Sequence, residues 1–399
     1  MNTNRFDAFT RAMGSRGTRR AALGGIAATG GLALLGRALA QDAATPDASA
    51  VPATPASGPL RVRKNAASLT AAEKEAFTDA ILALKAKPSP WINGLSTYDT
   101  FVLWHRDAFN CDIMAAHMGP AFLPWHRVFL HLFEQQLQSV EPTVNLPYWD
   151  WTVDNTPESP IWADDLMGGD GDPKEQNAVL TGPFKKGSWE ITVFDYADAV
   201  RSPFIVRSMG TGFMAKTLPT AEDVEAALAI AAYDAAPWNS TVATGTSFRN
   251  QLEGWQDCVS ETCDPVSGMG PKCVGPHNLH NRVHLWVAGE FRFASQAEPE
   301  TIDGTPVPVA IPSADPATDL MGTMSFNSSP NDPAFFLHHT NIDRIWTQWA
   351  AKHGNVYEPT SGATMGMNAD DMMWPYAMLG MHVTPNMALT TEAFGYTYE

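Results

Sequence analysis

Residues 279–287 read Leu-His-Asn-Arg-Val-His-Leu-Trp-Val, and the helix that they predict carries two possible metal ligands. His280 and His284 stand four residues apart, so in a helix both imidazole rings project from the same face. Imidazole is the commonest metal-ligand side chain and suits copper, zinc, iron and nickel. We therefore expect a helix over residues 278–287 that presents two ligands to one metal ion.

The other histidines extend this pattern to two groups. The first group is His105, His117, His126 and His131, and the second is His277, His280, His284, His338 and His339. No histidine occurs from 132 to 276, and only His353 and His382 follow. A single histidine is more often a core or surface residue than a ligand. Two groups that can each supply three imidazoles predict two metal ions held by two halves of one fold.

Helix signals place the remaining ligand candidates. Pro333 is expected to open a helix over 334–352, on which His338 and His339 point about 100° apart, so that His338 cannot easily share the ion. A helix over 98–109 carries His105, and a helix from Pro124 to about 140 carries His126 in its first turn. Gly119-Pro120 prevents a continuous helix over 116–124, which leaves His117 in a loop. Three converging imidazoles suit a trigonal copper site, and two such sites face to face can hold dioxygen.

The rest of the folded region gives weaker signals. Thr70-Ala71-Ala72-Glu73 is a capping box that predicts a helix ending before Pro88. Residues 155–245 show weak periodicity and are expected to form irregular loops with short helices or strands. They belong to the same domain, because the two histidine groups flank them and must meet. A long Pro-rich insertion is expected over 294–329.

Composition limits the class of protein. The chain has 399 residues, 44% of them hydrophobic, and a formal net charge of −17. So acidic a chain argues against nucleic acid or an anionic membrane as partner. The four cysteines are Cys111, Cys258, Cys263 and Cys273. They are too few for a disulfide scaffold and lack CxxC spacing, but they can still pair in three ways.

The first forty residues have the layout of an export signal. Arg19-Arg20 precedes an apolar stretch over 21–35 that ends in Ala38-Leu39-Ala40. This predicts a twin-arginine signal peptide over 1–40, a flexible linker over 41–60 and a folded domain over 61–399. The expected location is secreted, periplasmic or at the cell surface, with no membrane span once the signal is removed. An uncleaved membrane anchor is the alternative.

Three motifs resemble the copper-binding signatures of tyrosinases. They are Phe122-Leu123-Pro124-Trp125-His126-Arg127, residues 279–287, and Ser329-Pro330-Asn331-Asp332-Pro333 through Leu337-His338-His339. Pro147-Tyr148-Trp149-Asp150-Trp151 also matches that family. The similarity runs from about Leu60 to the end and is closest to the short actinobacterial tyrosinases. It implies a type 3 centre with two copper ions in a mainly α domain, built on a four-helix bundle with long irregular loops.

The resemblance assigns roles residue by residue. The first copper takes His105, His117 and His126, and the second takes His280, His284 and His339. His339 is chosen over His338 because it stands seven residues after Asp332, as the family ligand does. His131 is expected to be structural, and His277, His353 and His382 match no ligand position. Glu253 and Asn281 correspond to a pair that holds a water able to deprotonate an incoming phenol.

Three departures from the short bacterial pattern affect these roles. About twenty extra residues with three cysteines separate Glu253 from His280, which weakens the Glu253 assignment unless that loop bulges outward. Ala115 occupies the place of a cysteine that fungal relatives join to a ligand histidine, so no such thioether is expected. Leu285 and the insertion over 294–329 lie near the expected substrate mouth, so the family's substrate choice cannot be transferred.

The resemblance implies an exported copper phenol oxidase. It would use dioxygen to hydroxylate monophenols to o-diphenols and to oxidise o-diphenols to o-quinones. The alternatives are a catechol oxidase or o-aminophenol oxidase without monophenolase activity, and a hemocyanin-like oxygen carrier. A dizinc hydrolase is disfavoured, because no carboxylate stands at ligand spacing among the histidines. Expected partners are dioxygen, a phenolic substrate and, as a further possibility, a copper chaperone.

Overall fold

The computed structural model describes residues 58–110, 115–194, 202–212, 215–243, 245–254, 279–289, 300–302, 305–307 and 322–399. The export signal, most of the linker, all four cysteines, His277 and most of the Pro-rich insertion lie outside these residues. The described residues belong to one compact unit, Ala48–Glu399.

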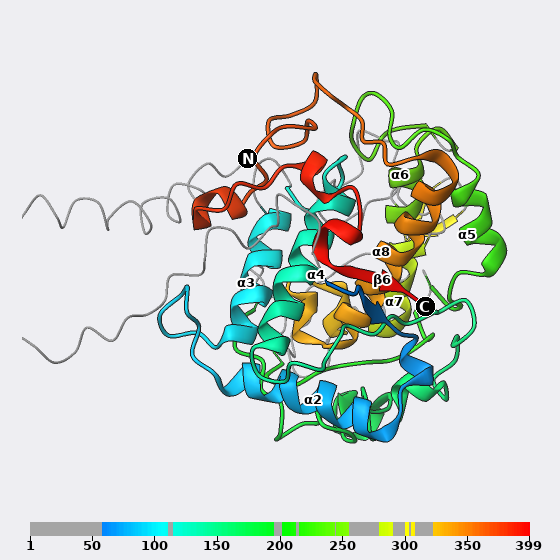
Figure 1. The fold of residues 1–399 in the computed structure, drawn as a ribbon. Coiled ribbons are helices and arrows are strands. Elements are labelled where there is room, and N and C mark those ends of the chain that lie inside the picture. Colours follow the sequence, from blue (N-terminus) through cyan, green and yellow to red (C-terminus); the bar gives the residue numbers. More distant parts are fainter. Residues whose placement is uncertain are drawn as a thin grey trace, which may run out of the picture. The chain divides into compact units, whose positions relative to one another are not determined.

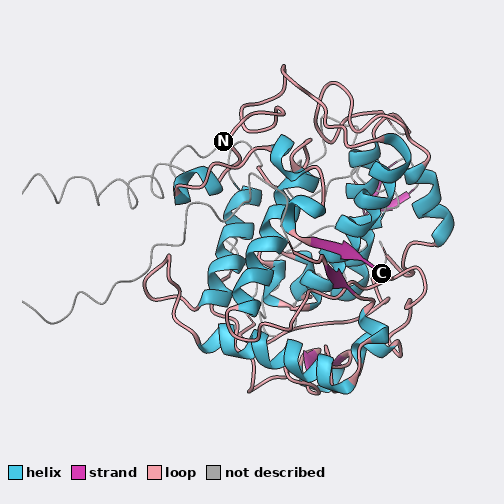
Figure 2. Cartoon of the chain, viewed as in Figure 1, coloured by secondary structure: helices cyan, strands magenta, loops and turns pink. Residues whose placement is uncertain are grey.

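Helices dominate the described part of the chain (Figures 1 and 2). They are α2 (Ala71–Ala86), α3 (Thr97–Asn110), α4 (Phe122–Gln138), α5 (Ala221–Leu228), α6 (Phe248–Glu253), α7 (Leu279–Ala288) and α8 (Ala334–His353). Short 3-10 helices link them: η1 (Ala66–Ser68), η2 (Pro160–Trp162), η3 (Pro173–Glu175), η4 (Thr323–Ser325), η5 (Ser329–Asn331), η6 (Tyr376–Leu379), η7 (Pro385–Ala388) and η8 (Glu392–Phe394). The predicted mainly α fold is confirmed.

The strands are few and short. A parallel pair joins β1 (Arg61–Arg63) to β6 (Tyr396–Tyr398), with Val62 opposite Thr397. Antiparallel pairs join β2 (Gly171–Asp172) to β3 (Ala178–Val179) and β4 (Glu300–Ile302) to β5 (Thr305–Val307). No larger sheet forms among the described residues, so helix packing supplies the core.

Local sequence signals account for the helix ends. At α2 both halves of the capping box are present, since Thr70 Oγ1 accepts from Glu73 N and a Glu73 carboxylate oxygen accepts from Thr70 N at 2.9 Å. Helix α4 begins two residues before Pro124, which leaves that proline in the first turn, where its missing N–H costs no hydrogen bond. Helix α8 begins directly after Pro333 and ends at Gly354.

Helices α4 and α8 pack together through a buried aromatic layer. The rings of Phe133 and Phe336 stack with centroids 3.6 Å apart, and Phe129 lies parallel to Phe336 at 6.0 Å. Helices α3 and α7 contact α4 and α8 respectively. These four helices carry five of the six predicted ligands, so their packing fixes where the imidazoles meet.

The β1–β6 pair is tied to the same two helices by buried charges. Arg63 of β1 donates to Glu134 of α4 at 2.8 and 3.2 Å and lies 3.4 Å from Asp343 of α8. Asp343 also accepts from Arg127 of α4 at 2.6 Å and from the Tyr396 hydroxyl of β6 at 2.6 Å. Both ends of the domain are thereby joined to α4 and α8.

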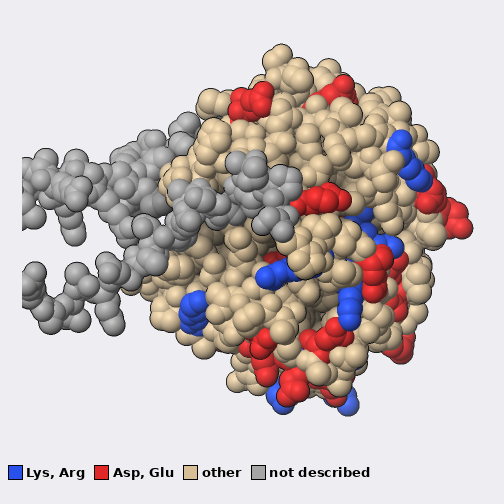
Figure 3. Space-filling view, in the orientation of Figure 1, with Lys and Arg blue, Asp and Glu red and all other residues tan. Residues whose placement is uncertain are grey.

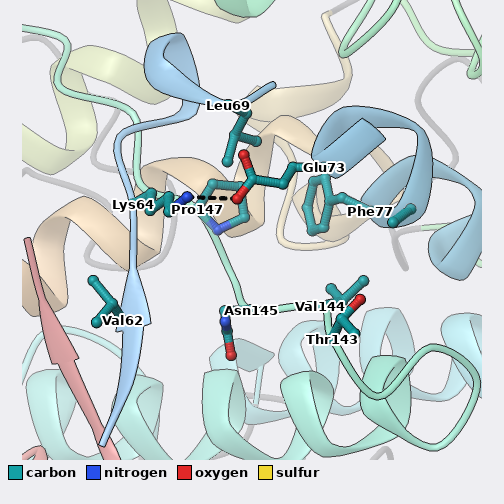
Figure 4. A pocket seen from close by; sticks show the side chains of 10 residues that line it. Val62, Lys64, Leu69, Glu73, Phe77, Thr143, Val144, Asn145 and Pro147 are labelled. Carbon is teal, nitrogen blue, oxygen red and sulfur yellow. Dashed lines mark hydrogen bonds and ion pairs between the residues drawn. The ribbon is translucent and has the colours of Figure 1, made fainter. Parts of the chain in front are cut away.

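A small surface pocket lies between β1, the start of α2 and residues 143–147 (Figure 4). The ion pair between Lys64 and Glu73, 2.5 Å long, crosses it, and no predicted ligand lines it. Acidic and basic side chains are interspersed on the face shown in Figure 3. Within the described ranges, no helix has the length and apolar character needed to cross a membrane.

Candidate metal centre

The first histidine group converges from three places in the fold. His105 comes from α3, His126 from α4 and His117 from the loop between them, and all three are 2% exposed. Their potential ligand nitrogens lie within 4.8 Å of one another. Nε2 of His117 lies 3.1 Å from Nε2 of His105, as expected for two rings aimed at one point.

The second group comes from α7 and α8. It contains His280, His284, His338 and His339, with ligand nitrogens again within 4.8 Å of one another. Nε2 of His339 lies 3.2 Å from Nε2 of His280 and 3.2 Å from Nε2 of His284. His339 therefore lies close to both histidines of α7, in a group that also contains His338.

The two groups face each other across one buried space. The rings of His126 and His339 stack with centroids 4.4 Å apart and an interplanar angle of 19°. The rings of His117 and His280 lie 5.7 Å apart. Six imidazoles thus lie close together in the interior between four helices.

Acceptors on the far side of the rings fix four of these imidazoles. Nδ1 of His105 lies 2.7 Å from the Asn327 carbonyl, and Nδ1 of His126 lies 2.8 Å from the Phe122 carbonyl. Nδ1 of His284 lies 2.8 Å from the Met324 carbonyl, and Nδ1 of His280 lies 2.9 Å from Asn281 Oδ1. An Nδ1–H that donates to an oxygen leaves the Nε2 lone pair for a metal, which is the usual arrangement around ligating histidines.

Burial keeps these rings neutral. Desolvation lowers the pKa of His117 to about 3 and that of His284 to about 4. Burial, reinforced by the neighbouring histidines, also lowers the pKa of His105, His126 and His339 well below the ordinary range. Neutral imidazole is the form that binds metals, so no proton has to be displaced at neutral pH.

The geometry fits a metal ion in each group. Metal–nitrogen bonds of about 2.0 Å place the ligands of a tetrahedral ion about 3.3 Å apart, close to the observed Nε2 separations. Among the described residues, Nε2 of His126 is buried with no hydrogen-bond partner. Both groups consist of histidine alone. An all-imidazole donor set suits copper, whereas carboxylates would favour magnesium, calcium or manganese.

His338 lies closer to the centre than the sequence predicted. Its ring stacks on that of His280, with centroids 5.2 Å apart at 19°, and both of its nitrogens are buried without a partner among the described residues. The sequence predicted that His338 cannot easily share the ion, yet α7 packs alongside α8 and brings His280 and His284 near both His338 and His339. No short Nε2 contact links His338 to another ring, so His339 fits the ligand role better.

The other histidines lie apart from the two groups. His131 packs against the Phe394 ring at 4.9 Å, which agrees with its expected structural role. His353 Nε2 lies 2.9 Å from the Leu228 carbonyl, and His382 is exposed. Ala115 is buried next to the His117 loop and has no sulfur, so the fungal type of thioether cannot form there.

Glu253 stands at the first group despite the insertion that follows it. It is fully buried at the end of α6, and its Oε1 accepts from Met118 N at 2.6 Å and lies 3.3 Å from His117 Nδ1. Its Oε2 accepts from Arg249 at 3.0 Å, and Arg249 also pairs with buried Asp234. Met118 has a φ of 58°, which non-glycine residues rarely adopt and which is common at functional sites.

Asn281 lies near Glu253, because both residues lie close to Nδ1 of His280. Its Oδ1 lies 2.9 Å from His280 Nδ1, and that nitrogen lies 3.3 Å from the backbone carbonyl of Glu253. Asn281 Nδ2 is buried and, within the described residues, donates to nothing. The two residues that the sequence paired therefore lie beside neighbouring ligands.

Comparison with known proteins agrees with this arrangement. The common central domain of tyrosinase matches residues 95–352, which include all six predicted ligands. The chain belongs to the tyrosinase family. A tyrosinase from Streptomyces glaucescens is 36% identical over 320 residues, covering 79% of this chain and 93% of that protein.

One further relative and one solved structure are also similar to this chain. A grixazone synthase from Streptomyces griseus is 34% identical over 327 residues, covering 75% of this chain and 88% of its own length. A mutant polyphenol oxidase from Thermothelomyces thermophila has a similar fold, with a TM-score of 0.53 at 21% identity over 85% of this chain and 88% of that one. The predicted resemblance and the prediction of two copper ions in a type 3 centre are confirmed.

Proposed function

We propose that this member of the tyrosinase family, a copper phenol oxidase, both hydroxylates monophenols and oxidises o-diphenols to o-quinones. The observation that carries the proposal is the convergence of two all-histidine groups on one buried space. Family membership alone does not define the substrate, because the relatives include both tyrosinases and a grixazone synthase.

The six ligands would divide evenly between the metals. His105, His117 and His126 would hold the first copper, and His280, His284 and His339 the second. When bound, the copper pair supplies the oxygen and redox chemistry, which belongs to the cofactor. The protein fixes four of the rings through Nδ1, and their burial keeps the imidazoles neutral.

Glu253 and Asn281 would remove the phenol proton before hydroxylation. Glu253 is a buried carboxylate whose Oε1 lies 3.3 Å from Nδ1 of the ligand candidate His117, so a water held by this carboxylate would stand beside the first copper site. Asn281 Nδ2 offers a donor to the same water. The phenol hydroxyl would give its proton to this water, and the buried carboxylate raises the basicity of that water.

The decisive experiment compares initial rates on L-tyrosine, L-DOPA and 2-aminophenol with copper-loaded protein. Turnover of all three supports the proposal, whereas activity on L-DOPA or 2-aminophenol without L-tyrosine identifies a catechol or o-aminophenol oxidase. No turnover of any of them, with reversible oxygen binding, would identify a hemocyanin-like carrier. Metal analysis before the assay distinguishes a dicopper from a dizinc protein.

Export by the twin-arginine route is the second part of the proposal. Arg19 and Arg20 are the only arginine pair of the leader, so Arg19→Lys with Arg20→Lys should retain the oxidase in the cytoplasm. Unchanged extracellular activity in that double variant would indicate another secretion route. A copper-delivering partner is compatible with this route, although export itself would not require one.

A further inference from the structure

Seven of the 17 methionines of the chain lie within residues 365–387. We call this stretch the methionine segment, and its methionines are Met365, Met367, Met372, Met373, Met378, Met381 and Met387. It follows α8 and lies outside the residues matched by the tyrosinase central domain, 95–352. The family match therefore gives it no role.

Packing explains only part of this segment. Met367, Met373 and Met381 are at most 6% exposed and fill the core, a common use of this flexible side chain. Met365, Met372 and Met378 are 78%, 37% and 41% exposed. Three exposed thioethers stabilise no core, so their presence needs another explanation.

Hydrogen-bonded turns of the backbone connect the positions that carry the exposed methionines. Asp371 Oδ2 accepts from the backbone N–H groups of Gly366 at 2.9 Å and Asn368 at 3.1 Å, closing a turn that has Met365 and Met372 at its two ends. Met373 N donates to the Val383 carbonyl at 2.9 Å, closing a second loop. Met372 directly precedes Met373, and exposed His382 directly precedes Val383. Met378 lies on the loop between Met373 and Val383.

The same segment packs on the elements that carry the first histidine group. A Cβ built on Gly119, two residues after His117, would lie 3.0 Å from Met367 Sδ. Trp125, the residue before His126, donates from its indole N–H to the Trp374 carbonyl at 2.6 Å. The η7 part of the segment also contacts α4, and Figure 1 shows this part of the chain, orange-red to red, passing beside α3 and α4.

We propose that the methionine segment binds copper(I) at the protein surface and supplies it to the first copper site. Thioether sulfur is a soft ligand that selects copper(I), and imidazole from His382 can complete a mixed site. The buried thioether of Met367, two residues after exposed Met365, lies next to Gly119 of the His117 loop. The ion passes from sulfur to imidazole nitrogen without a change of oxidation state. The proposal rests on the dicopper centre and not on which phenol is oxidised.

Loading kinetics of the metal-free full-length chain test this proposal. Under anaerobic conditions, copper(I) buffered by bathocuproine disulfonate is offered to the parent and to the triple variant Met365→Leu, Met372→Leu, Met378→Leu. Leucine keeps the volume and apolar character of methionine, so the fold should be retained. We expect loading to slow roughly tenfold, equivalent to about 1.4 kcal/mol of lost binding at uptake. The final content should remain two coppers per chain, as measured by metal analysis.

Two controls separate metal capture from a change in structure. Met209→Leu replaces a buried methionine outside the segment and should load copper(I) at the parent rate. Copper(II), which thioethers bind poorly, should load the triple variant at the parent rate. Silver(I), a redox-inert probe of soft sites, should bind the fully copper-loaded parent in excess of the triple variant, because the four cysteines are common to both proteins. Equal copper(I) loading in parent and triple variant, or equal slowing with both oxidation states, would overturn the proposal.

Discussion

At the scale of single residues, the sequence identified the candidate ligands but not the atoms that orient them. The i, i+4 spacing of His280 and His284 follows directly from helix geometry and is visible in any sequence. The carbonyls of Asn327 and Met324, which accept from His105 and His284, leave no side-chain signal. Candidate ligands could therefore be proposed from the sequence, whereas ring orientation required the packed structure.

The first residue-scale prediction concerns Glu253. Glu253→Gln removes the negative charge that would hold the basic water, so we expect monophenol turnover to fall about ten- to a hundredfold. Diphenol turnover should change much less, because the copper ligands are untouched. The measurement is the ratio of L-tyrosine to L-DOPA rates at matched copper content.

Asp234→Asn provides the matched control for this variant. Asp234→Asn also removes a buried carboxylate paired with Arg249, but it leaves the Glu253 carboxylate beside His117 in place. An equal fall of the rate ratio in both variants would mean that Glu253 acts only by neutralising Arg249.

The second residue-scale prediction separates the two adjacent histidines of α8. His339→Ala removes the ring whose Nε2 lies near both His280 and His284, so about one copper per chain should remain and oxidase activity should be lost. His338→Ala removes a ring that stacks on His280 without a short Nε2 contact, and its effect on copper content should be far milder. Copper analysis after dialysis is the measurement, and the reverse result would exchange the two assignments.

At the scale of elements, helix ends were predictable where caps or prolines mark them. The ends of α2, α3 and α8 fall within about two residues of the expected positions, because the capping box and Pro333 act locally. Helix α6 was not predicted as a helix, since its six residues lack a periodic apolar face. Ser247 and Gly254 cap its ends, and Arg249 pairs with distant Asp234, a contact that local sequence does not reveal.

The element-scale prediction concerns the start of α8. Asp332 accepts from Ala334 N at 3.0 Å and receives a bidentate Arg207 at 2.7 and 2.8 Å, with both side chains fully buried. Asp332→Asn leaves the Arg207 charge buried without its partner, which should cost about 3–5 kcal/mol of folding free energy. Urea unfolding of the metal-free protein measures this loss.

Asp165→Asn is the comparison for Asp332→Asn. Asp165 pairs with Lys74 at the surface, with its side chain 55% exposed, so its loss should cost at most about 1 kcal/mol. Similar losses in the two variants would show that the buried pair contributes no more than a surface pair.

At the scale of the whole molecule, the buried imidazoles make stability depend on pH. In the metal-free protein, burial lowers the pKa of His117 to about 3 and of His284 to about 4, whereas unfolding returns them to about 6.5. Below pH 6.5 the unfolded chain therefore binds protons that the folded chain does not, and the free energy of unfolding falls as the pH drops toward 4. Above pH 6.5 these rings are neutral in both the folded and the unfolded chain, so the free energy of unfolding no longer changes with pH through them.

Urea midpoints of the metal-free protein between pH 4 and pH 8 measure this dependence. His284→Leu removes one buried base and should reduce the slope below pH 6.5, while His382→Ala at the surface should leave it unchanged. An identical slope in parent and His284→Leu would contradict the expected contribution. Bound copper should keep the slope at least as steep near pH 4, because it binds the folded state and prevents the folded rings from taking up protons.

The long-range order of the molecule was the least predictable part. The histidine groups predicted that distant segments must meet, and they do meet. The pairing of Arg61–Arg63 with Tyr396–Tyr398 joins residues more than three hundred positions apart and has no motif in either strand. The cluster of Arg63, Glu134 and Asp343 beneath it consists of single charged residues whose partners only the fold reveals.

The β1–β6 pair has a consequence for biosynthesis. Strand β1 leaves the ribosome among the first folded residues, yet its only strand partner, within the described chain, is Tyr396–Tyr398. The contact between Arg63 and the Tyr398 hydroxyl can therefore form only after residue 398 has been translated. The β1–β6 pair cannot form before residue 398 has left the ribosome, and a nascent chain stalled before residue 396 should be more sensitive to protease than the full-length protein.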